Sequence, residues 1–155
     1  MVFDFAARPP EINSGLMYAG AGAGPLMAAS SAFSALSSDL GSNAASSESV
    51  ISHLGSEWQG PSSTAMAAAA QPYIDWLTTT SGQLQEAATQ ATASAAAYEA
   101  AFAAMIPPPV IAANRATLAA LVATNFLGIN TPAIMANEAH YAQMWSQGHC
   151  QLEPT

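Results

Sequence analysis

The segment Glu57-Trp58-Gln59-Gly60-Pro61 decides the fold, because it interrupts two long stretches rich in alanine and serine. Gly60 can adopt a positive φ at the end of a helix, and Pro61 suits the first turn of the next helix. Trp58 adds a large amphipathic ring to the corner. We therefore predict a helical hairpin that reverses here. Many hairpins have such a corner for structural reasons alone, so the turn by itself does not define a function.

Apolar residues recur every seven residues on both sides of this corner, which predicts coiled-coil-like helices from Pro25 to about Ser56 and from Ser62 to about Met105. The repeat consists of Leu26, Phe33, Leu40 and Leu54 before the corner, and of Leu77, Leu84, Ala91, Tyr98 and Met105 after it. Asn43 and Ser47 are polar positions that can fix the register against one partner. Tyr73 and Trp76 widen the second stripe beyond what one helix covers, so we expect a partner there.

Shorter elements flank the hairpin. A helix is expected to follow Arg8-Pro9-Pro10-Glu11 and to end near Tyr18, before a glycine-rich elbow at residues 20–25. Further helices are expected from Val110 to about Asn125 and from Pro132 to just before Gly148. The loop between them, residues 126–132, carries three large apolar residues, which either bind a partner or pack inward.

Composition excludes several functions. Only 8% of the residues are charged, the net charge is −8, and Arg8 and Arg115 are the only basic side chains. Nucleic acid is therefore excluded as a partner, and an anionic membrane surface is disfavoured. We expect no transmembrane segment and find no secretory signal peptide pattern. Cys150 is the only cysteine, and no catalytic, nucleotide-binding or metal-binding motif occurs, so we expect no enzyme activity, no metal and no cofactor.

Three motifs carry a resemblance to the mycobacterial PPE family that covers about residues 1–147. They are Pro9-Pro10-Glu11, Trp58-Gln59-Gly60 and the segment Asn125-Phe126-Leu127-Gly128-Ile129-Asn130-Thr131-Pro132. The resemblance implies an all-α domain whose two long antiparallel helices complete a four-helix bundle with a PE protein. We expect the PE interface to include Leu26, Phe33, Leu40, Leu54, Tyr73, Leu77, Leu84 and Tyr98.

The resemblance also assigns roles to the two turns. The turn at Trp58 and Gly60 is expected to serve secretion, at one end of the bundle. The opposite tip, which comprises Asn125, Phe126, Leu127, Gly128 and Ile129, is expected to bind an EspG-type cytosolic chaperone. Export by a type VII secretion system is implied, which needs no signal peptide. The expected location is then the cell surface or the outside of the cell, after a cytosolic stage, with a host-interaction role.

Residues 148–155 depart from the family pattern, so we expect a PPE domain at 1–147 that is truncated at its last helix, followed by a disordered tail. The residues leave open a function of another class, in which the chain is a self-associating helical structural protein. Co-expression distinguishes the two, because the adaptor requires a PE partner for solubility, whereas the structural protein forms a soluble symmetric oligomer alone.

Overall fold

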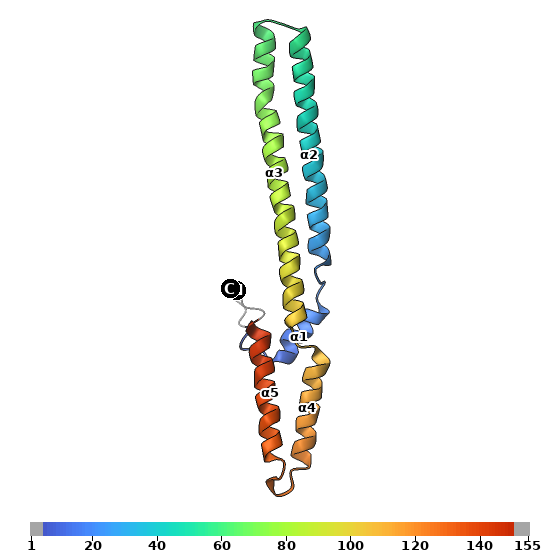
Figure 1. Ribbon diagram of the computed structural model, residues 1–155, viewed down its shortest axis with the longest axis vertical. Helices are drawn as coiled ribbons and strands as arrows, with labels where there is room; N and C mark the ends of the chain where they lie inside the picture. Colours follow the sequence, from blue (N-terminus) through green and yellow to red (C-terminus); the bar gives the residue numbers. More distant parts are fainter. Residues whose placement is uncertain (1–4, 151–155) are drawn as a thin grey trace. The chain divides into compact units, whose positions relative to one another are not determined.

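The computed structural model describes residues 5–150 and shows an all-α chain over that range, as predicted (Figure 1). Its helices are α1 (Pro10–Ala19), α2 (Gly24–Glu57), α3 (Pro61–Ala104), α4 (Pro108–Ala123) and α5 (Thr131–Cys150), with a 3₁₀ turn η1 (Phe126–Gly128) between the last two. Each α-helix has a proline among its first two residues, where the missing N–H costs no helical hydrogen bond. Proline thus marks where each helix begins.

The contacts divide the chain into two compact units. The first comprises the residues up to Gly22 and those from Ala97 onward, and the second is Ala23–Ala96. We call them the terminal unit and the hairpin unit. The terminal unit contains α1, α4, α5 and the last turns of α3, and the hairpin unit contains α2 and the rest of α3.

The hairpin unit is held together by a seam of small residues. Ser30, Ser37 and Ala44, seven residues apart on α2, are buried against α3. Ser37 Oγ donates to the Ser81 carbonyl at 2.9 Å, and Ser81 Oγ donates back to the Ser37 carbonyl at 2.8 Å. Ser30 Oγ donates to the Ala88 carbonyl at 2.9 Å. Small side chains let the two backbones approach closely enough for these bonds between helices, and each bond satisfies a buried hydroxyl.

This seam corrects the prediction of a seam made of large residues. The contact between α2 and α3 instead uses the seven-residue repeat of Ser30, Ser37 and Ala44. A hydrophobic cluster lies toward one end of the hairpin and is made of Ala44, Ile74 and Leu77, with Leu40 and Ile51 packed against it. Phe33 and Leu54 remain 38% and 39% exposed. Phe33 and Leu54 are therefore left for another surface, whereas Leu40 contributes to the contact between the helices.

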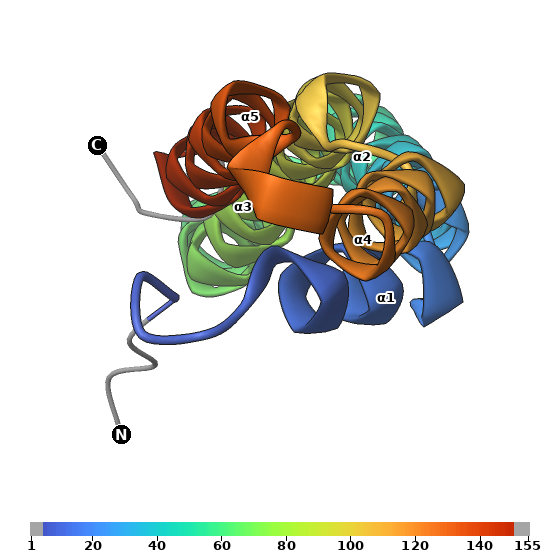
Figure 2. The ribbon, with the colours of Figure 1, turned by 90° about the horizontal axis from the view of Figure 1, so that it is seen from below.

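In the terminal unit, α1, α4 and α5 pack against one another, as Figure 2 shows in a view along α4 and α5. Ile111 and Met144 form its centre, each with 1% of its surface exposed. Ser14 Oγ donates to the Ile106 carbonyl at 2.6 Å, which fastens α1 to the segment between α3 and α4.

The helix α5 continues to Cys150, whereas we predicted an end before Gly148. Gly148 is buried, so this glycine lies in a packed helix and does not terminate it. The expected disordered tail at 148–155 is therefore wrong for residues 148–150, which belong to α5, and residues 151–155 lie outside the described residues. The stretch Pro61–Ala123 is long and apolar enough to span a membrane by length and composition, with a mean hydropathy of 1.3 in its best window, of which 17% is buried. Core helices of soluble proteins pass the same test, so this is weak evidence for a span.

Candidate partner-binding surfaces

The hairpin unit exposes large apolar side chains on both helices. On α2, Leu36 and Val50 are 48% and 58% exposed, and they belong to the same exposed side as Phe33 and Leu54. On α3, Tyr73 and Trp76 are 56% and 57% exposed, and their rings stack with centroids 6.1 Å apart. We call these residues the apolar face: Phe33, Leu36, Val50 and Leu54 of α2, and Tyr73 and Trp76 of α3.

A groove joins the two helices within the apolar face. It has a volume of about 380 Å³ and is lined by Ser46, Ser47, Val50, Ile51 and Tyr73. Four of these residues belong to α2 and one to α3, so Val50 and Tyr73 border the same depression. An amphipathic helix docks in such a groove by inserting side chains spaced three or four residues apart. The groove therefore has the form of a helix-binding site.

Some residues expected at the PE interface are occupied by contacts within the chain. Leu77 is only 2% exposed and lies in the cluster with Ala44 and Ile74, which corrects its expected place on an outer stripe. Tyr98 belongs to the terminal unit, where its hydroxyl donates to the Met17 carbonyl at 3.1 Å. Leu26 and Leu84 are half-buried. Of the expected residues, Phe33, Leu54 and Tyr73 are the most exposed.

The corner between α2 and α3 has the predicted geometry. Trp58 follows the last residue of α2, and its backbone N–H donates to the Leu54 carbonyl at 2.8 Å. Gly60 has a φ of +122°, a conformation that side-chain-bearing residues rarely adopt, and α3 begins directly after it at Pro61. The Trp58 side chain is 49% exposed. This ring is thus accessible at the corner and adds little to the core of the hairpin.

The tip between α4 and α5 presents apolar side chains to solvent. Phe126, Leu127 and Ile129 are 75%, 87% and 71% exposed, so the alternative in which this loop packs inward does not hold. Leu127 has a φ of +52° and Gly128 a φ of +80°. Positive φ costs a leucine roughly 1–2 kcal/mol, so the turn is strained where its most exposed side chain is presented.

Polar contacts at the base of the tip hold that strained turn. Asn125 Oδ1 accepts a hydrogen bond from the Asn130 backbone N–H at 2.8 Å. Asn130 Nδ2 donates to the Leu121 carbonyl at 3.1 Å and to Thr124 Oγ1 at 2.8 Å. Asn125 and Asn130 thus close the loop with their side chains, while the three apolar side chains face outward. The apolar residues of the loop predict an apolar tip, but they do not predict the polar contacts made by Asn125 and Asn130.

The Pro9-Pro10-Glu11 segment anchors α1. Pro10 is buried, and Glu11 Oε2 accepts a hydrogen bond from the Tyr141 hydroxyl of α5 at 2.9 Å. Arg115 of α4 lies over the Tyr141 ring, 3.7 Å from its centroid, and its Nη1 is 2.9 Å from Glu138 Oε1. Burial, and then the hydrogen bond to Glu11, raise the pKa of Tyr141 above its ordinary value, which keeps the phenol protonated. The motif therefore has a structural role in the terminal unit.

The described residues include no group of three or more His, Cys, Asp or Glu side chains that could hold a metal ion. The features that stand out are instead an apolar face on a helical hairpin and an apolar tip on a second pair of helices. Together they define the class of the chain as an all-α domain with exposed apolar surfaces suited to contact with other proteins.

The chain belongs to the PPE family, whose pattern it matches over residues 4–151. It is 66% identical over 145 residues to the PPE family protein PPE15 of Mycobacterium tuberculosis (strain ATCC 25618 / H37Rv), an alignment that covers 93% of this chain and 37% of the relative. From the same strain, the uncharacterized PPE family proteins PPE45 and PPE29 are 57% and 55% identical, again over 93% of this chain, and 36% and 34% of their own lengths are covered. The chain thus spans about a third of the length of these relatives.

Proposed function

We propose that this PPE domain is a non-enzymatic adaptor that pairs with a PE protein through the apolar face. The pair would be exported by a type VII secretion system, after a cytosolic stage in which an EspG-type chaperone covers the tip. Export would place the chain at the cell surface or outside the cell. One observation carries the proposal: the hairpin closes mainly through small residues and leaves the six large apolar side chains of the apolar face exposed.

The energetics of the apolar face favour a protein partner. Leu36, Val50, Tyr73 and Trp76 are each about half exposed. Covering a large apolar side chain contributes up to roughly 1.5–3 kcal/mol, so a partner that completes the burial of several such residues gains substantial stability. A helical hairpin suits this surface, because the apolar residues follow two long helices and meet in a groove.

The tip has the features of a separate anchor. Phe126, Leu127 and Ile129 project from a turn that the Asn125 and Asn130 side chains hold closed. Because this turn is ordered before binding, a chaperone groove can receive the three side chains without an additional cost of ordering the loop. The tip and the apolar face are therefore proposed to serve different partners.

Co-expression with a PE protein tests the pairing. We expect a soluble one-to-one complex. We expect Val50→Asp to abolish it, because burying a carboxylate in the groove without a partner has a free-energy cost on the order of several kcal/mol. Ser38→Asp is the matched control, since Ser38 is an exposed residue of α2 and lies twelve residues from Val50, about 120° around the helix. A soluble symmetric oligomer of the chain alone would favour the self-associating structural protein instead.

A further inference from the structure

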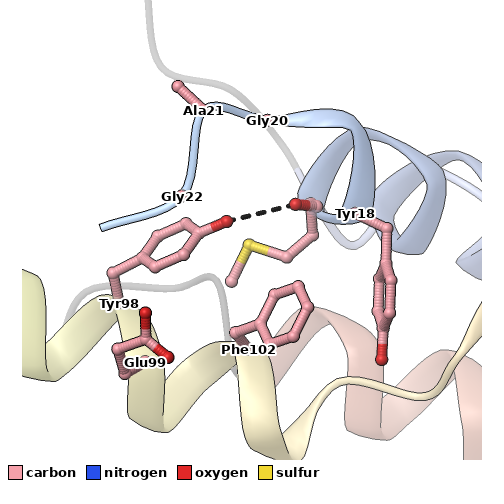
Figure 3. A pocket seen from close by; sticks show the side chains of 8 residues that line it. Tyr18, Gly20, Ala21, Gly22, Tyr98, Glu99 and Phe102 are labelled. Carbon is pink, nitrogen blue, oxygen red and sulfur yellow. Dashed lines mark hydrogen bonds between the residues drawn. The ribbon is translucent and has the colours of Figure 1, made fainter. Parts of the chain in front are cut away.

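An aromatic pocket lies in the terminal unit, beside the turn that follows α1 (Figure 3). Its volume is about 240 Å³. The side chains that define it are Met17, Tyr18, Tyr98, Glu99 and Phe102, and the backbone of residues 20–22 closes one side. Three aromatic rings, a thioether and a carboxylate thus surround one small opening, which neither of the proposed partner surfaces includes.

Contacts within the chain fix the aromatic walls. The Tyr98 hydroxyl donates to the Met17 carbonyl at 3.1 Å, and Figure 3 shows this bond reaching across from α3 to α1. The Phe102 ring lies 4.5 Å from the Tyr18 ring and 6.2 Å from the Tyr98 ring, measured between centroids. At Gly20 an added Cβ would lie 3.8 Å from the Tyr98 hydroxyl, so the backbone passes close to the ring. The pocket therefore exists before any ligand arrives.

The chemistry of the lining favours a cation. The faces of aromatic rings carry negative electrostatic potential and attract cationic groups. Glu99 adds a carboxylate, and within the described part of the chain no ion pair to Glu99 is found. Neither Arg8 nor Arg115, the two basic residues, lines the pocket. The pocket thus presents negative potential without a basic side chain of its own.

The terminal unit already contains a cation, the Arg115 guanidinium, that contacts both an aromatic ring and a carboxylate. The Arg115 guanidinium lies 3.7 Å from the centroid of the Tyr141 ring and pairs with Glu138 at 2.9 Å. In the aromatic pocket, Glu99 adjoins Tyr98 in sequence, and both line the opening. A planar guanidinium stacks on rings and is more weakly hydrated than an ammonium group, so it is the cation that suits an aromatic wall beside a carboxylate.

We propose that the aromatic pocket binds the guanidinium group of an arginine side chain from another polypeptide. The guanidinium stacks on the aromatic wall and donates hydrogen bonds to the Glu99 carboxylate. This site is independent of the pairing at the apolar face, and either proposal can fail without the other.

Ligand-observed NMR on the full chain, as a complex if it purifies as one, tests the proposal with N-acetyl-arginine amide as the probe. We expect saturable binding of this probe and none of N-acetyl-citrulline amide, its uncharged isostere. Glu99→Gln is expected to weaken binding about threefold or more, because an exposed charge pair contributes modestly. Glu86→Gln is the matched control, since it removes the same charge from an exposed position on α3 outside the pocket, and it should leave the affinity unchanged.

Tyr98→Phe separates a role of the ring from a role of the hydroxyl. This variant keeps the ring face and loses the hydrogen bond to Met17, so we expect arginine binding to persist. Equal binding of the citrulline probe, an equal loss with Glu86→Gln, or no saturable binding to the unmodified chain would each overturn the proposal.

Discussion

Charges placed at the tip should release the chaperone without unfolding the domain. The perturbation is the double substitution Phe126→Asp with Leu127→Asp, at two side chains that are 75% and 87% exposed. Exposed substitutions usually change the free energy of unfolding by no more than about 0.5 kcal/mol. Leu127 has a φ of +52°, which aspartate adopts more readily than leucine, so the turn itself should tolerate the change.

The expected loss of chaperone affinity is large. If a chaperone groove buries both side chains, each contributes roughly 1.5–3 kcal/mol, and losing both removes about 3–6 kcal/mol. Since every 1.4 kcal/mol is about a tenfold change, the dissociation constant should rise at least about a hundredfold. The two carboxylates also pay for desolvation, which adds to the loss.

The assay is co-expression with a PE partner and an EspG-type chaperone, followed by size-exclusion chromatography and titration calorimetry. We expect the variant to keep the PE protein and to lose the chaperone. Ala116→Asp with Ala119→Asp is the control, because it adds the same two charges at exposed positions of α4. Chaperone retained by the tip variant would refute the assignment of Phe126 and Leu127 as the anchor.

Three further outcomes are expected. The chain purified alone should aggregate or unfold without cooperativity because its apolar face is exposed, and a sharp calorimetric melt of a monomer would contradict this. Trp58→Ala should leave the PE complex assembled and impair secretion from a mycobacterial host, since the ring is 49% exposed; normal export, or loss of the complex, would be inconsistent with this role. Ser37→Leu should lower the free energy of unfolding of the complex by about 1–3 kcal/mol in urea, because it overpacks the seam. Ser38→Leu should change it by less than about 0.5 kcal/mol, and equal effects would count against the seam.

Turn chemistry predicts much of the fold. Gly60 and Pro61 locate the corner because one must adopt a positive φ and the other fits a first helical turn, and the structure has both features. At Gly148 the same kind of reasoning gives a wrong prediction. A glycine near the end of a helical pattern usually indicates a C-terminus, but at this position α5 continues to Cys150 and the residue is buried.

The seam is the part that hydrophobic periodicity misses. Ser30, Ser37 and Ala44 contribute little to an apolar pattern, although they repeat every seven residues as the leucines do. Ser81 and Ala88 of α3, whose carbonyls accept hydrogen bonds from Ser37 and Ser30, have the same spacing, and this match of small residues is the available signal. The contact is decided by how closely two backbones approach, which a count of large apolar residues does not measure.

The surfaces are predictable in part. The surplus width of the second helix is found at Tyr73 and Trp76, which are 56% and 57% exposed, whereas the first repeat is predicted as the seam and leaves Phe33 and Leu54 exposed instead. Leu77 is misplaced, since its repeat assigns it with Leu84 to the partner interface, yet it fills the seam beside Ala44. Tyr98 is misplaced because its hydrogen bond to Met17 joins residues distant in the sequence, which no periodicity reveals.

Site-specific photo-crosslinking tests the central claim most directly. A benzoylphenylalanine at Val50, in the groove of the apolar face, should crosslink to a co-expressed PE protein, whereas the same residue at Ser38, on another side of α2, should not. Crosslinks to PE from Ser38 but not from Val50, or crosslinks from Val50 only to a second copy of this chain, would contradict pairing with a PE protein through the apolar face.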